Sequence, residues 1–113
     1  MNDDWSLLDV SRIDEVAALL GSELSSVLAE SHANLARNLG ILDDPPSIDA
    51  FTRASHAIAS ASLQLGMSRL GEDARKLERT APSLSVEDRA AAARTLRELA
   101  TRSRAALEAH LAR

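Results

Sequence analysis

The chain has 113 residues, a formal net charge of −4 at pH 7, a hydrophobic fraction of 45% and no cysteine. This length suits one domain, residues 1–113, with a single hydrophobic core and no separate catalytic module. The negative charge argues against nucleic acid as the main partner, since a surface that binds a polyanion is normally basic, and the lack of cysteine excludes disulfides and thiolate metal sites.

Alanine and leucine supply almost all of the apolar residues, with one Trp, one Phe and no Tyr, a composition that suits helices better than sheets. No apolar run approaches the ~20 residues that span a bilayer, and the acidic segment Met1–Trp5 lacks the basic and then apolar order of a signal peptide. We therefore expect an all-α, soluble, cytoplasmic protein that binds no membrane. Trp5 is expected to anchor the amino-terminal segment against the helices.

Two helices are predicted in the first part of the chain, where apolar residues recur at steps of three and four. Asp9 or Ser11 can cap the first helix, and Gly21 ends or bends it. The second helix begins at Ser22, runs for about 17 residues and is expected to end at Gly40.

A loop at Asp43–Pro46 separates the second helix from the third, because neither proline has an amide hydrogen to donate. Ser47 begins the third helix, whose apolar stripe keeps a three-four alternation for about five turns until Gly66. A fourth helix is predicted from about Met67 and stops before Ala81-Pro82.

Gly71 is expected to be a weak point inside the fourth helix, because glycine is a poor helix former. Ser85 begins the fifth helix, with Asp88 in the register of a capping box, and this helix runs toward Leu111. Short connections between long amphipathic helices force neighbours to run antiparallel. The predicted architecture is therefore an antiparallel up-down four-helix bundle, with the short additional N-terminal helix laid across one end.

His56 stands out in the third helix. On a helical wheel it lies about 140° from Phe51 and about 160° from Ile58, so it should point into solvent. The residues that come after it on the same face, Ala59 and Ser60, are small. Most exposed helical histidines are simply solvated, so the spacing alone leaves the function open.

The other titratable groups favour structural interpretations. His32 is expected at the edge of the core as a packed, hydrogen-bonded imidazole. His110 is near the carboxyl end of its helix, where a positive charge interacts favourably with the helix dipole. Three histidines so dispersed make no metal site. The charged residues of the fourth helix are interpreted as a solvated face with weak local ion pairs: Glu72, Asp73 and Glu78 with Arg75, Lys76 and Arg79.

The segment Ala54–Gly66 contains a histidine, an aliphatic residue two positions on, small or hydroxyl residues four and six positions on, and a glycine ten positions on. This pattern resembles the signature of the histidine-phosphotransfer family of two-component phosphorelays. The similarity continues at Leu70 and at the Leu77-Glu78 pair, and Leu7-Leu8-Asp9 resembles the opening of the family. The resemblance thus covers nearly the whole chain.

The resemblance implies that Nε2 of His56 accepts a phosphoryl group from an aspartate of one receiver domain and passes it to another. The partners would be receiver domains of response regulators and hybrid histidine kinases, which would also bring the magnesium ion. The chain itself would bind no cofactor or metal, have no kinase or hydrolase activity of its own, and act as a monomer. The expected docking surface comprises Thr52, Ala59, Ser60, Leu63 and Gly66.

Two positions depart from the family pattern. Where the family usually has a lysine three residues after the histidine and a glycine four after it, this chain has Ala59 and Ser60. Arg53, three residues before His56 on the same face, is the candidate replacement for the missing positive charge near the phosphoryl oxygens. The serine side chain at position 60 is small, so it should not block the approach of a partner to His56.

Two alternatives remain open. The first is a protein-binding module that resembles the family but is not phosphorylated, which the missing lysine favours. The second is a dimerising helical hairpin such as the dimerisation domain of a histidine kinase. In such a domain the histidine is normally followed by an acidic residue, and Ala57 stands at that position here.

Overall fold

The computed structural model describes residues 7–45 and 47–113, which form helices and connecting turns with no strand among them. The helices are α2 (Val10–Leu20), α3 (Leu24–Asp43), α4 (Ile48–Gln64), α5 (Ser68–Thr80) and α6 (Val86–Leu111), with short 3₁₀ turns at Gly21–Glu23 and Ala81–Ser83. In this part of the chain no helix is long and apolar enough to cross a membrane. The expected anchoring role of Trp5 lies outside the described residues.

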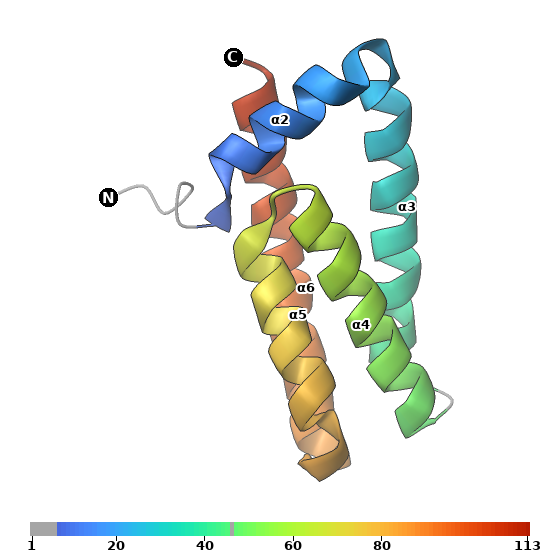
Figure 1. Ribbon diagram of the computed structural model, residues 1–113. Helices are drawn as coiled ribbons and strands as arrows, with labels where there is room; N and C mark the ends of the chain where they lie inside the picture. The colour runs from blue at the N-terminus through green and yellow to red at the C-terminus, as the bar shows by residue number, and fades with distance from the viewer. Residues whose placement is uncertain (1–6, 46) are drawn as a thin grey trace.

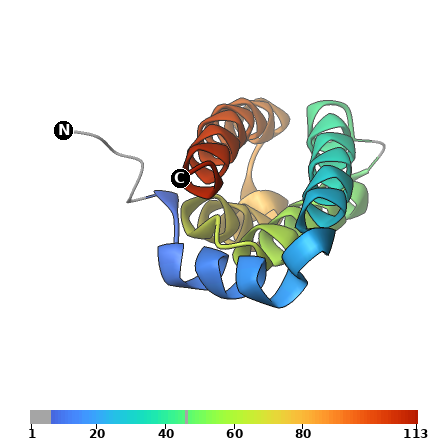
Figure 2. The same ribbon diagram turned by 90° about the horizontal axis from the view of Figure 1, so that it is seen from above.

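Helices α3, α4, α5 and α6 lie side by side with their long axes close to one direction, and α2 crosses one end of them (Figure 1). Seen from above, α2 runs from the side of α5 and α6 across to α3 (Figure 2). The most extensive packing is between α4 and α5, while α3 packs on α4 and α6, and α6 packs on α5. The described residues thus confirm the all-α class that the composition predicts.

Side-chain caps define where three of the helices begin. The side chain of Asp9 accepts a hydrogen bond from the backbone N–H of Arg12 at 3.1 Å, which identifies Asp9 rather than Ser11 as the cap of α2. Ser47 and Ser85 accept corresponding bonds at the start of α4 and α6, at 3.1 and 3.0 Å. Each cap satisfies an amide that the helix itself leaves unbonded, so these helix starts are confirmed as predicted.

The prediction that Gly40 ends the second helix is wrong, because α3 continues to Asp43. Leu42, one turn from Leu39 on the inner face, is only 1% exposed, so the extra turn buries an apolar side chain. This gain exceeds the roughly 1 kcal/mol that a glycine costs inside a helix. The helix stops where Asp44 precedes Pro45 and leaves the helical region of the backbone, with φ −145° and ψ 70°.

The turn between α4 and α5 holds α2 in place. Gly66 has a φ of +83°, a conformation that glycine adopts without strain, and the N–H of Met67 returns to the carbonyl of Ser62 at 2.9 Å. The carbonyl of Gly66 accepts the backbone N–H of Asp9 at 2.8 Å. A Cβ at Gly66 would lie 2.5 Å from Cγ1 of Ile13, so the close approach of α2 depends on this glycine.

Gly71 is a packing site rather than a weak point. It is buried on the face of α5 toward α4, and a Cβ at this position would lie 2.5 Å from Cγ of Leu63. Its neighbours on the inner side of α5, Leu70 just before it and Ala74 three residues after it, are fully buried. The missing side chain therefore lets α5 approach α4 closely, which fixes the relative positions of the side chains that the two helices display.

We expect Gly71→Ala to destabilise the protein by about 1–3 kcal/mol, because Leu63 and the backbone of α4 must move to admit the new methyl group. The matched control is Gly40→Ala. Gly40 is exposed inside α3 and a Cβ there meets nothing within 4 Å, so this variant should be more stable than the parent by about 0.5–1 kcal/mol. Urea denaturation measures both, and equal stabilisation by the two substitutions would contradict the close packing.

Candidate functional site

His56 lies in the middle of α4 with its side chain directed outward. Its neighbours Ser55 and Ile58 are 0% and 1% exposed, whereas the side chain of His56 is 66% exposed. The outward position results from the helical period, since the residues that face the core sit on the opposite side of the helix. The predicted exposure of His56 is confirmed.

One ring nitrogen of His56 is held by a carboxylate from the neighbouring helix. Nδ1 lies 3.1 Å from Oε1 and 3.0 Å from Oε2 of Glu78, which is on α5 and whose side chain is 30% exposed. An ionised carboxylate accepts hydrogen bonds and has none to donate, so the proton between the two groups belongs on Nδ1. In the neutral imidazole Nε2 then carries the free lone pair on a side chain that is 66% exposed, which is the arrangement of a nucleophile.

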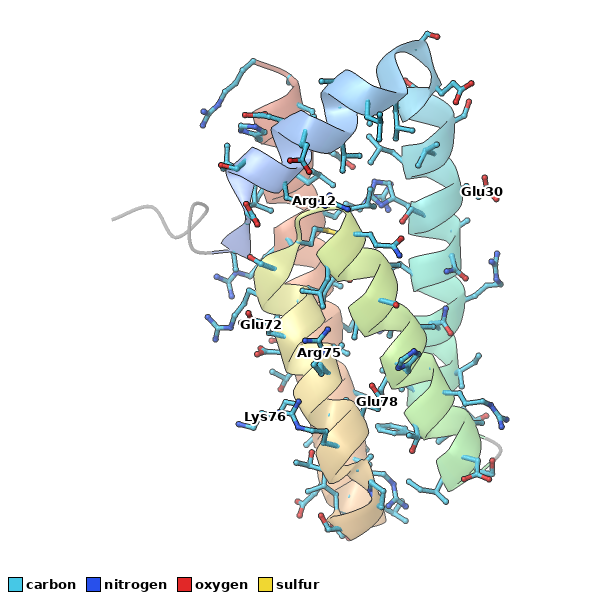
Figure 3. All side chains as sticks on the ribbon, in the orientation of Figure 1. Arg12, Glu30, Glu72, Arg75, Lys76 and Glu78 are labelled. Carbon is cyan, nitrogen blue, oxygen red and sulfur yellow. The ribbon has the colours of Figure 1, made fainter. Side chains whose placement is uncertain are left out.

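A surface hollow of about 430 Å³ surrounds this pair. Its lining comes from two helices: Thr52, His56, Ala59 and Ser60 of α4, and Arg75, Glu78 and Arg79 of α5. Figure 3 shows Glu78 on the side of α5 toward α4, whereas Lys76 and Glu72 point away from α4. Two arginines and one glutamate thus line the hollow on the side of α5.

The predicted docking residues separate into two groups. Thr52, Ala59 and Ser60 line the hollow, although Ala59 is only 3% exposed and forms part of its floor. Leu63 is half-buried against Gly71, and Gly66 is buried beneath the start of α2, so neither lines the hollow. Their part in docking stays a prediction.

The candidate charge partner Arg53 is exposed but is not part of the lining of the hollow, which takes its guanidinium groups from α5. The sequence pattern assigns the charged residues of α5 to local ion pairs on a solvated face. The structure instead pairs Glu78 with a histidine 22 residues earlier in the chain. Leu77 is buried in the core and Glu78 follows it on the side of α5 toward α4 (Figure 3), so the contact depends on how the two helices pack.

The other two histidines are in different environments. His110, at the carboxyl end of α6, bonds through Nε2 to Oδ1 of Asp14 at 2.7 Å and so joins α6 to α2. His32 is half-buried as expected, but its Nδ1 is buried without a hydrogen-bond partner among the described residues. Burial, aided by the nearby Arg104, lowers the pKa of His32 below its ordinary value, against an opposing effect of Glu108.

Residues 7–45 and 47–113 contain no group of three or more His, Cys, Asp or Glu side chains placed to hold a metal ion. Comparison of the chain with models of known protein families, with curated proteins and with solved structures finds no match. The function must therefore be inferred from the residues around His56 and their geometry.

The tautomer of His56 tests the contact with Glu78. For the neutral ring in the parent protein we expect the Nδ1–H tautomer to predominate, because only that form donates to the carboxylate. Long-range ¹H–¹⁵N correlation spectra distinguish the two ring nitrogens. Glu78→Ala should shift the population toward the Nε2–H form that free imidazoles favour, while Glu72→Ala should leave it unchanged. A parent protein already in the Nε2–H form would contradict the assignment.

His32 should make the folded protein sensitive to acid. The unfolded chain takes up a proton on this residue near pH 6.5, the ordinary pKa, whereas the folded protein has a lower pKa and resists protonation. The free energy of unfolding should therefore fall as the pH drops below about 6.5. Denaturation curves between about pH 7 and pH 5 should show a steeper fall for the parent than for His32→Leu. Parallel curves would show that the folded and unfolded chains protonate alike.

Proposed function

We propose that this chain is a cytoplasmic histidine-phosphotransfer domain, in which Nε2 of His56 accepts a phosphoryl group from a receiver-domain aspartate and passes it to another receiver domain. The observation that carries the proposal is the contact of Nδ1 with Glu78 at 3.0 and 3.1 Å. It orients an exposed imidazole and directs the reactive lone pair of Nε2 away from the protein, toward an approaching partner.

In the proposed reaction, the bond between phosphorus and the receiver's aspartyl oxygen breaks as the bond between phosphorus and Nε2 forms. The aspartate leaves as a carboxylate, and the proton stays on Nδ1, so the phosphorylated ring becomes a cation. Glu78 then faces a positive ring instead of a neutral one, and its hydrogen bond becomes an ion pair. The carboxylate thereby stabilises the phosphorylated ring, and the reverse transfer releases the same neutral imidazole.

Phosphoryl transfer depends on in-line positioning and on neutralising the charge of the transferred group. In this proposal the receiver domain supplies the aspartate and the magnesium ion, and this chain supplies the imidazole and a surface on which to dock. The small side chains of Ala59 and Ser60 support this proposal, because they leave the imidazole ring open to a partner. Such a small contact suits a transient encounter of a monomer with its receivers.

The fold belongs to the same proposal. We take α3, α4, α5 and α6 as an antiparallel up-down four-helix bundle, with α2 as the additional N-terminal helix. The connections between them are short, at residues 44–47, 65–67 and 81–85, which supports an alternation of chain direction. In this arrangement α4 and α5 form a hairpin, and the histidine and its carboxylate come from its two arms.

The second candidate function is a binding module that resembles this family but does not carry phosphate. The observation in its favour is Ala59, which stands where the family usually has a lysine and is only 3% exposed. The His56–Glu78 pair favours the carrier, since a surface that only docks a partner does not need one imidazole nitrogen to be held and the other left free.

Radiolabelled transfer separates the two functions. Receiver domains phosphorylated by their kinases are mixed with the purified protein, and the label is followed on a gel under conditions that preserve phosphohistidine. We expect label on the parent protein and on His110→Gln, and none on His56→Gln. If a panel of all the receivers from the same cell leaves the parent protein unlabelled while binding it, the binding module replaces the carrier.

A further inference from the structure

Arg75 and Arg79 are the two arginines that line the same hollow as His56. They stand four residues apart on α5, so they share one face of the helix, and both line the hollow that contains His56. Neither forms an ion pair with any of the described residues, whereas Arg69 on the same helix pairs with Asp73 at 3.4 Å. The one carboxylate in the hollow, Glu78, directs both of its oxygens to the histidine.

The hollow therefore has two guanidinium groups whose charge is not matched by a carboxylate bonded to them. Guanidinium presents a planar set of N–H donors that suits the oxygens of phosphate. Three features converge here: an imidazole with its free nitrogen in solvent, two unpaired guanidiniums on one side, and the hydroxyl side chains of Thr52 and Ser60 on the other.

We propose that Arg75 and Arg79 form a phosphoryl-binding site that receives the oxygens of a phosphoryl group bound to Nε2 of His56. This inference rests on the proposed function and assigns the charge-neutralising role to α5 instead of to Arg53 on α4. In the unphosphorylated protein the two arginines remain solvated. After transfer they face the dianionic phosphoryl group, while Glu78 faces the cationic ring.

A site of this kind makes the phosphorylated protein more stable relative to the unphosphorylated one, whatever partner delivers the group. The equilibrium between free reactants and free products does not depend on how tightly a donor docks, so it separates phosphoryl binding from partner binding. Phosphoramidate is a suitable donor because it needs no receiver. Its P–N bond breaks, the bond between phosphorus and Nε2 forms, and the nitrogen leaves as ammonia.

The experiment loads the full chain with phosphoramidate at a fixed ammonia concentration and at one fixed pH. The phosphohistidine signal is integrated by ³¹P NMR against an internal standard, and the free His56 fraction follows from the total protein concentration. The variants are Arg75→Gln, Arg79→Gln and the double variant, and the matched controls are Lys76→Gln and Arg53→Gln, which each remove one exposed positive charge outside the hollow. Thermal unfolding checks that every variant is folded.

Each single variant should lower the loaded ratio about threefold, as expected for partly solvated charged contacts, and the double variant roughly tenfold. Both controls should match the parent protein. The site is refuted if Arg75→Gln and Arg79→Gln load as well as Lys76→Gln, or if Arg53→Gln alone lowers the ratio. Phosphoryl transfer from a phosphorylated receiver domain to the parent protein is measured in a separate experiment. Its absence would overturn the carrier function, whereas equal loading of the arginine variants by phosphoramidate would overturn only the arginine site.

Discussion

The contact between Nδ1 of His56 and the carboxylate of Glu78, at 3.0 and 3.1 Å, joins two helices and depends on how closely they approach. The approach is set in the core by Gly71, whose missing side chain admits Leu63 of α4. At one end of the two helices, Gly66 with its φ of +83° forms the turn that connects them. The positions of His56 and Glu78 on the surface are thus determined by core residues that neither side chain contacts.

The same two helices give the site its electrostatic character. From α4 come the imidazole and small side chains, and from α5 come one carboxylate and two guanidinium groups. The carboxylate is bonded to Nδ1, so it leaves Nε2 free for the anion that our proposal places there. In the proposed reaction Glu78 would stabilise the charged ring, and Arg75 and Arg79 would bind the transferred phosphoryl group.

Much of the fold could be predicted because its signals are local. Ser47 and Ser85 cap helices through an amide three residues away, and the exposure of His56 results from the period of one helix. The end of α3 could not be predicted in this way, because the local penalty of Gly40 is smaller than the gain from burying Leu42.

Less of the candidate site than of the fold could be predicted from the sequence. Glu78 is not recognisable as a site residue from its own helix, because its partner lies 22 residues away and only the packing of α4 on α5 brings them together. In our proposal this same residue determines which nitrogen of His56 carries the phosphoryl group. The most direct measurement identifies the phosphohistidine isomer formed when a phosphorylated receiver domain loads the uniformly ¹⁵N-labelled protein, using ¹⁵N and ³¹P NMR. We expect a single species phosphorylated at Nε2, with the proton retained on Nδ1 beside Glu78, whereas phosphorylation at Nδ1, or on a residue other than His56, would contradict the proposal.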